Sequence, residues 1–310
     1  MQKLTDNLKK HRIMDALIYK IFRKTAIFET LRFKAWLFTK KLKYTSNLNP
    51  IVIGGCPRSG TTLLRSLIGI HPEIASPKNE CNIIMWINNK GILRNVFDFS
   101  HKEIRTLKTK HKDLVCFVEN VLKLYMQKED KKFVALKHPF HIIIIDELFR
   151  SFPNMKFINV IRDGRDVSCS LRTHPKRKMV KGEIVPNSIK NPFDWCIRRW
   201  VSCINQGKKW RKSNRYIEIK YEDLVNDPLS TMEKIFQFIG LKMIDEDKLL
   251  NFYKYEKDEK HLQNIEVGKP IFRKTIGRWK KDMIEKEKEL FKHMAGEMLI
   301  ELEYEEDFNW

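Results

Sequence analysis

Glycine, arginine and hydroxyl residues gather in one short stretch of the sequence, residues 54–62, which reads Gly-Gly-Cys-Pro-Arg-Ser-Gly-Thr-Thr. It follows the apolar run 51–53 and leads into a helical pattern over 61–70. A glycine-rich turn that opens a helix presents unpaired backbone N–H groups, and the helix dipole favours an anion there. An ordinary strand-to-helix turn is the simpler alternative. We predict an anion site made by Arg58, Ser59, Gly60, Thr61 and Thr62.

One position in this loop limits the kind of phosphate ligand. The nucleotide-triphosphate loop reads G-x-x-x-x-G-K-[ST], with a lysine that reaches the β- and γ-phosphates. Gly55 and Gly60 have the required separation, but Thr61 stands where the lysine would be. Arg58 supplies positive charge from inside the loop instead. The pattern therefore favours a 5′ phosphate-like group without a γ-phosphate and weakens the interpretation as a P-loop nucleotide kinase.

A second stretch, 162–170, has the same physical character. Arg162 and Arg165 flank a glycine where the apolar run 156–161 ends, and Ser170 follows eight residues after Arg162. Arginine side chains at a strand end, followed by a helix start, form an anion site by the same argument. A surface ion pair between Arg162 and Asp163 is the plainer alternative. Two anion loops in one sheet suit a bis-phosphorylated nucleotide.

The elements that must position these loops alternate along the chain. Short apolar runs at 51–53, 133–136, 156–161 and 216–219 predict buried strands, and helical patterns follow at 61–70, 141–150, 164–172 and 228–240. Strands that alternate with helices predict an α/β fold of three layers, with a central parallel sheet between helices. Ligands of such sheets bind beyond the carboxyl ends of the strands.

The run Pro-Arg-Ser-Gly-Thr-Thr-Leu-Leu-Arg at 57–65, followed by His71-Pro72, resembles the 5′-phosphosulfate loop of sulfotransferases that use PAPS (3′-phosphoadenosine 5′-phosphosulfate). The resemblance is nearest to the tyrosylprotein sulfotransferase branch and its bacterial relatives. It implies a P-loop-like α/β/α fold and sulfuryl transfer from PAPS to a hydroxyl acceptor, with Arg162 and Ser170 as ligands of the 3′-phosphate. It implies no metal, because basic residues take the place of Mg²⁺ as the charge neutraliser.

The resemblance also suggests the catalytic groups. Residues 136–140, Leu-Lys-His-Pro-Phe, resemble the Lys-x-Pro-Phe segment of the tyrosylprotein branch, so Lys137 is expected to neutralise charge on the leaving oxygen. A solvated surface lysine is the alternative. A general base must take the acceptor proton. Glu80 is the leading candidate, although an ungapped match places Asn79 on the family's glutamate, and His138 and His141 are the other candidates.

The remaining cofactor-binding candidates lie later in the chain. Residues 221–224, Tyr-Glu-Asp-Leu, resemble a family segment whose tyrosine lies near the nucleotide, which points to Tyr221; a strand end followed by a helix N-cap is compatible with this. Residues 268–270 and 277–280 resemble the family's closing loop, and there Lys269, Arg278 and Trp279 could cover the nucleotide. The larger cytosolic branch often has glycine after its Arg-Lys pair, where this chain has Thr275.

Two ranges fall outside the resemblance. Residues 1–48 carry 12 Lys and Arg against Asp6, Asp15 and Glu29, with apolar residues at helical spacing, and predict a basic amphipathic segment. It either packs on the domain or lies on an anionic membrane surface. Residues 49–310 then form the sulfotransferase domain. Within it, 82–130 predicts a helical insertion that would select the acceptor.

Composition narrows the classes of protein further. The 310 residues are 42% hydrophobic, without an apolar run long enough to span a membrane and without a secretory signal pattern. Six scattered cysteines without metal-ligand spacing predict reduced thiols and a cytoplasmic protein, and the basic segment 1–48 could make that protein membrane-peripheral. The net charge of +21 would attract any polyanion. A non-enzymatic basic protein explains that charge but not the two anion loops, so we predict no specific nucleic acid partner. The acceptor and the oligomeric state are not specified.

Overall fold

Five parallel strands in the order β2-β3-β1-β4-β7 form the central sheet of the computed structural model. The structure describes residues 44–82, 90–109, 113–173, 176–180, 183–187, 190–255 and 269–310. The strands are β1 (Ile51–Gly55), β2 (Ile74–Ala75), β3 (Phe133–Lys137), β4 (Lys156–Ile161) and β7 (Tyr216–Lys220). The four predicted strands are present, and the predicted α/β/α fold is confirmed. Strand β2 has only two residues, too few to give a sequence pattern.

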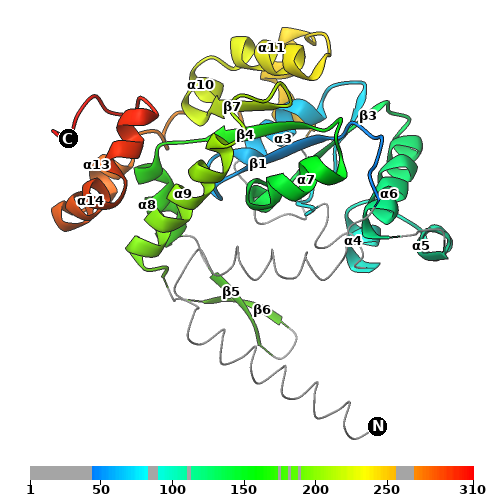
Figure 1. The fold of residues 1–310 in the computed structure, drawn as a ribbon, viewed down its shortest axis with the longest axis horizontal. Helices are drawn as coiled ribbons and strands as arrows, with labels where there is room; N and C mark the ends of the chain where they lie inside the picture. The colour runs from blue at the N-terminus through cyan, green and yellow to red at the C-terminus, as the bar shows by residue number, and fades with distance from the viewer. Residues whose placement is uncertain are drawn as a thin grey trace, which may run out of the picture.

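The two faces of the sheet are built by strict alternation of apolar side chains. Ile51 and Ile53 in β1 belong to one core cluster, whereas Val52 between them belongs to the other. Neighbouring side chains of a strand point to opposite faces, so a strand that is apolar throughout must be covered on both. Figure 1 shows this arrangement, with α3, α10 and α11 on one side of the sheet and α7 and α9 on the other.

The helices on the first face are α3 (Thr61–Gly69), α10 (Tyr221–Asn226), α11 (Pro228–Ile239) and α12 (Glu246–Leu250), followed by the short 3₁₀ turn η2 (Phe252–Tyr255). Local sequence signals fix their ends. The Asp227 side chain accepts from Ser230 N to cap α11, Pro228 occupies its first turn, and Gly240 ends it at φ 79°.

The second face carries the 3₁₀ turn η1 (Pro139–Ile144), α7 (Ile145–Ser151), α8 (Gly164–Thr173) and α9 (Phe193–Lys208). The predicted helix at 141–150 is thus divided into η1 and α7. A pair of antiparallel strands, β5 (Lys176–Val180) and β6 (Glu183–Asn187), follows α8 and was not predicted.

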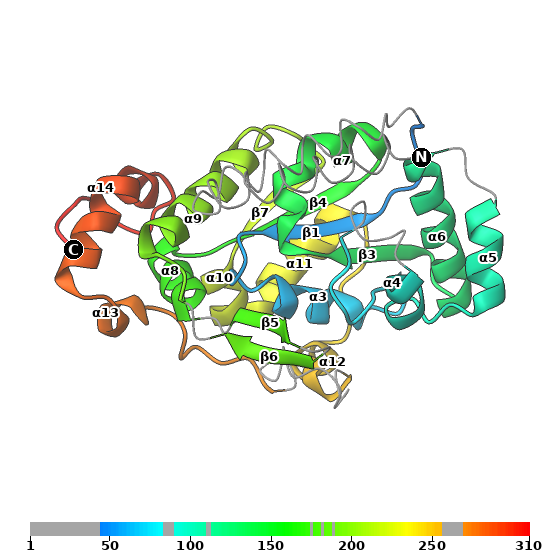
Figure 2. The same ribbon diagram turned by 90° about the horizontal axis from the view of Figure 1, so that it is seen from below.

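The chain ends in α13 (Trp279–Asp282) and α14 (Glu285–Glu301), which lie beside α8 and α9 in both Figure 1 and Figure 2. Helices α4 (Lys90–Asn95), α5 (His101–Thr109) and α6 (Leu114–Glu129) lie within the range 82–130. The N-terminal segment 1–48 falls outside the described residues except for 44–48. Among the described helices, none has both the length and the apolar character needed to cross a membrane.

Candidate active site

The first anion loop joins β1 to α3 and has a tightly constrained backbone. Arg58 has φ 77° and Gly60 has φ 93°, both in the left-handed region. A Cβ atom on Gly60 would lie 2.3 Å from the Tyr221 ring, so only glycine fits there. Gly60 is also the N-cap of α3 and supplies no side-chain cap. The first N–H groups of α3 are therefore available to an anion.

The second anion segment, at the end of β4 and the start of α8, contacts the first directly. Arg58 Nε donates to Ser170 Oγ at 3.0 Å, and Arg162 Nη1 donates to the Arg58 carbonyl at 3.1 Å. The Arg162 guanidinium also donates to the Thr275 carbonyl and lies 4.5 Å from the centroid of the Tyr221 ring. Two segments 104 residues apart in sequence thus form a single site.

Positive charge accumulates where these segments meet. Burial lowers the pKa of Arg58, and the like charges of Arg162 and Arg278 lower it further. The buried Arg162 Nε has no hydrogen-bond partner among the described residues. Crowded cations and an unused donor atom fit a polyanionic ligand, which would relieve the repulsion and accept the donor's hydrogen bond.

Lys137 stands at the carboxyl end of β3 and is buried, with 2% of its side chain exposed. Its Nζ donates to Thr62 Oγ1 at 2.9 Å and to Glu80 Oε1 at 2.5 Å. Burial lowers the pKa of Lys137, while the Glu80 carboxylate raises it in part. The ammonium group therefore connects the first turn of α3 to a carboxylate that is 41% exposed.

Two histidines follow Lys137, and both are neutral. Burial lowers the pKa of His138 to about 3 and that of His141 to about 3. His138 Nδ1 accepts from Phe140 N at 3.2 Å, which leaves the ring proton on Nε2, 3.9 Å from Glu80 Oε2. His141 Nδ1 donates to the Ile53 carbonyl at 3.1 Å. His138 thus presents an N–H group, and not a base, toward Glu80.

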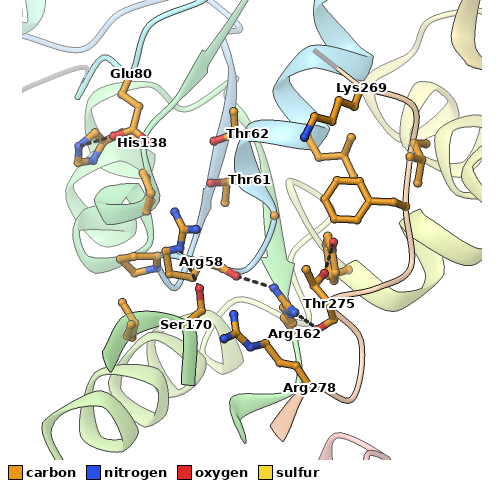
Figure 3. Close-up of a pocket in the computed structure, with 18 of the residues that line it drawn as sticks. Arg58, Thr61, Thr62, Glu80, His138, Arg162, Ser170, Lys269, Thr275 and Arg278 are labelled. Carbon is orange, nitrogen blue, oxygen red and sulfur yellow. Dashed lines mark hydrogen bonds and ion pairs between the residues drawn. The ribbon is translucent and has the colours of Figure 1, made fainter. Parts of the chain in front are cut away.

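These groups surround one cavity of about 490 Å³. In Figure 3, Glu80 and His138 lie at one end, Arg58, Ser170, Arg162 and Arg278 lie at the other, and Thr61 and Thr62 lie between them. The predicted site residues that line the cavity are Arg58, Gly60, Thr61, Thr62, Glu80, His138, Arg162, Ser170, Tyr221, Lys269 and Arg278.

Three predicted site residues do not line the cavity. The Ser59 side chain is fully buried, and Lys137 reaches the site only through Thr62 and Glu80. Trp279 packs instead against Arg165, whose guanidinium carbon lies 3.8 Å from the centroid of the Trp279 ring. The Trp279 ring is thus held in this contact outside the cavity, and its role in covering the nucleotide stays a prediction.

Sequence reasoning missed two residues that organise the site. Asp166 is fully buried and accepts from Gly277 N at 2.8 Å and from Trp279 N at 3.0 Å. Thr275 accepts from Arg162 through its carbonyl, and its hydroxyl lies 3.0 Å from the Tyr221 hydroxyl. Asp166 lies inside the second anion segment, and Thr275 lies between the two stretches of the predicted closing loop. Neither residue type indicated which distant group would be its partner.

The comparisons with known proteins match this geometry. The profile of the sulfotransferase family matches residues 50–246. This chain belongs to the sulfotransferase family. The match includes both anion loops, Lys137, Glu80 and Tyr221, and it ends before the segment that contains Lys269 and Arg278. The alternative of a P-loop kinase is not supported.

Several curated relatives of this chain are protein-tyrosine sulfotransferases. It is 28% identical over 221 residues to protein-tyrosine sulfotransferase 2 of Gallus gallus, covering 66% of this chain and 54% of that protein. It is 31% identical over 175 residues to protein-tyrosine sulfotransferase 1 of Rattus norvegicus, covering 53% and 43%. The chain thus spans about half the length of these relatives.

Solved structures share the fold. The sulfotransferase domain of the Synechococcus PCC 7002 olefin synthase has a TM-score of 0.58 and 18% identity, covering 82% of this chain and 96% of that one. The sulfotransferase domain of the curacin biosynthetic pathway has a TM-score of 0.57 and 18% identity, with coverages of 82% and 98%.

Two further predictions concern metals and thiols. No cluster of three or more potential metal ligands occurs in the part of the chain that the structure describes. None of the six cysteines forms a disulfide bond, and five of them are buried.

Proposed function

We propose that this sulfotransferase moves a sulfuryl group from PAPS to a hydroxyl acceptor and releases adenosine 3′,5′-bisphosphate. The observation that carries the proposal is the contact between the two anion segments, Arg58 Nε to Ser170 Oγ at 3.0 Å, within one cavity. A nucleotide that carries anionic groups at both its 5′ and 3′ positions can occupy the two segments together. The absence of the P-loop lysine at Thr61 agrees with a donor that has no γ-phosphate.

The donor's phosphosulfate is assigned to the start of α3, and its 3′-phosphate to Arg162 and Ser170. This places the sulfuryl group near Thr62, the residue to which the Lys137 ammonium donates. In transfer, the bond between sulfur and the leaving phosphate oxygen breaks as a bond from sulfur to the acceptor oxygen forms. Lys137 stabilises the negative charge that develops on the leaving oxygen.

Glu80 is proposed as the general base. Its carboxylate lies at the end of the cavity away from Arg162 and is partly exposed, so an acceptor hydroxyl can reach it. His138 Nε2 faces the same carboxylate at 3.9 Å, and its other nitrogen accepts from Phe140 N. This arrangement supports Glu80, rather than His138, as the proposed base.

Nucleotide binding tests the donor assignment. Adenosine 3′,5′-bisphosphate should raise the melting temperature of the protein without added metal, and ATP with Mg²⁺ should raise it less. Arg58→Ala and Arg162→Ala should each abolish the shift, because each removes a cation that contacts the opposite segment. Stabilisation by ATP with Mg²⁺ alone would contradict the proposal.

Turnover tests the catalytic assignment. Glu80→Gln should lower kcat by about 10²- to 10⁴-fold, the usual contribution of a general base, while the Kd for adenosine 3′,5′-bisphosphate is unchanged. His138→Asn is the matched comparison and should lower kcat less, because it leaves the Glu80 carboxylate and its ion pair with Lys137 in place. Wild-type turnover in Glu80→Gln would contradict the assignment of Glu80 and make His138 the candidate for the general base.

The acceptor is also a proposal. Because the relatives described above are named protein-tyrosine sulfotransferases, a tyrosine-containing peptide is the first acceptor to assay with labelled PAPS. Carbohydrate, lipid and small-molecule hydroxyl acceptors belong in the same screen, because a shared donor site says little about the acceptor.

A further inference from the structure

The last residues of the sequence, Leu302–Trp310, return to the second anion segment; we call them the C-terminal segment. Figure 1 shows this end of the chain beside α13 and α14, near α8. The Tyr304 hydroxyl donates to Glu222 Oε2 at 3.0 Å, and Glu222 Oε1 accepts from Asp163 N at 3.1 Å. The C-terminal segment is therefore linked through Glu222 to the backbone next to Arg162.

Arg165 is the centre of these contacts, although it does not line the cavity. Only 2% of its side chain is exposed, and Asp163 and Glu305 both form ion pairs with it. Its guanidinium carbon lies 3.8 Å from the centroid of the Trp279 ring and 4.5 Å from that of Trp310. The two rings contact each other edge to face at 5.5 Å.

The Trp279 side of this cluster reaches the cavity through the backbone. Trp279 N and Gly277 N both donate to Asp166, one residue after Arg165. Arg278, between Gly277 and Trp279, lines the cavity. The Arg278 guanidinium itself forms an ion pair with Asp282, with Nε 2.6 Å from Oδ2. A fixed Trp279 ring holds the backbone from which Arg278 extends, and fixing this loop also holds the Thr275 carbonyl against Arg162.

We propose that Arg165 and Trp310 are positioning residues for donor binding: together they hold the loop 275–279 so that Arg162 and Arg278 face the 3′-phosphate. This inference rests on the proposed function. Neither side chain touches the donor or the reacting atoms, so their loss should weaken donor binding and leave the chemical step unchanged.

Trp310→Ala is the cleanest variant, because it removes one ring and leaves every charge of the cluster in place. We expect the Kd for adenosine 3′,5′-bisphosphate, measured by titration calorimetry, and the KM for PAPS to rise about tenfold, with kcat within about twofold of wild type. Trp310→Phe keeps an aromatic face and should change both by less than about threefold.

Arg165→Lys is the second variant, since lysine keeps the positive charge but lacks the planar guanidinium that contacts two rings and two carboxylates. It should raise the same Kd about as much as Trp310→Ala. In the double variant, Trp310→Ala with Arg165→Lys, the rise in Kd should be smaller than the product of the two single rises, because both substitutions act through one contact.

Phe236→Leu provides a control for simple destabilisation. Phe236 is fully buried in α11, on the opposite face of the sheet, and belongs to the other core cluster. The Phe236→Leu substitution should lower the melting temperature without changing the Kd for adenosine 3′,5′-bisphosphate. A wild-type Kd in Trp310→Ala and Arg165→Lys, or an equal rise in Phe236→Leu, would overturn the inference. A wild-type protein that does not bind the nucleotide would instead overturn the proposed function.

Discussion

The two anion segments of this chain are built differently. The first, residues 54–62, gets its shape from its own backbone, with left-handed conformations at Arg58 and Gly60. The second, residues 162–170, is held by partners that are far away in the sequence. Trp200 Nε1 donates to the Arg162 carbonyl at 3.0 Å, and Asp166 accepts from Gly277 and Trp279. Substitutions within the first segment should therefore disturb its shape most, whereas the second segment should also be disturbed by substitutions at residues far away in the sequence.

Gly60→Ala should have the largest effect on donor binding. The new Cβ would lie 2.3 Å from the Tyr221 ring, and a left-handed backbone costs about 1–2 kcal/mol for a non-glycine residue. We expect the Kd for adenosine 3′,5′-bisphosphate to rise about a hundredfold or more by calorimetry. Gly240→Ala is the matched control: φ is 79° and no atom lies within 4 Å of the new Cβ, so only stability should fall. Equal Kd values in the two variants would refute the local origin of the first segment's shape.

The neutral side chains of His138 and His141 should make the stability of the fold sensitive to acid. The pKa of His141 is about 3 in the folded protein, against about 6.5 in an unfolded chain. Between these values the unfolded chain binds a proton that the folded one does not. The free energy of unfolding should therefore fall as pH falls from about 6.5 toward 3, by about 1.4 kcal/mol per pH unit for each such histidine.

His141→Asn removes one titrating group and retains a donor for the Ile53 carbonyl. Urea unfolding at several pH values between 7 and 4 should show a shallower dependence on pH than wild type, by about one proton. An unchanged slope would show that His141 does not contribute to the acid sensitivity.

Trp200→Phe should have the smallest effect, and it tests the distant support of the second segment. Phenylalanine keeps most of the buried ring but loses the donor to the Arg162 carbonyl, which costs about 1 kcal/mol. We expect the Kd for adenosine 3′,5′-bisphosphate to rise about threefold, with kcat unchanged. A tenfold loss of kcat at a constant Kd would show that this contact serves the chemical step instead.

Much of the fold could be predicted because its signals are local. The strands β1, β3, β4 and β7 are short apolar runs bounded by turn residues or helical patterns, which is typical of a parallel sheet covered on both faces. Strand β2 was missed because two residues carry no period. The hairpin β5–β6 was missed because its run Lys-Arg-Lys-Met-Val has no clear alternation of apolar and polar residues.

Cavity-lining residues could be predicted from the sequence where their residue type and their place at the end of a strand were both visible. Arg58, Arg162, Ser170 and Tyr221 all line it, because the carboxyl ends of parallel strands meet at one edge of the sheet. Trp279, which was expected near the nucleotide, does not line the cavity. An aromatic residue beside arginines fits a nucleotide or a cation–π contact equally well, and nothing in its neighbours distinguishes the two.

The sequence by itself determined the chemistry that the two anion segments offer, because glycine at a left-handed turn and arginine at a strand end act through their own backbone and charge. Only the tertiary structure decided how those groups are held. The proton position on His138, the burial of Lys137 and the attachment of Trp310 to Arg165 depend on atoms brought together from distant parts of the chain. Local residue types cannot specify such contacts, because burial and partner identity are properties of the packed whole.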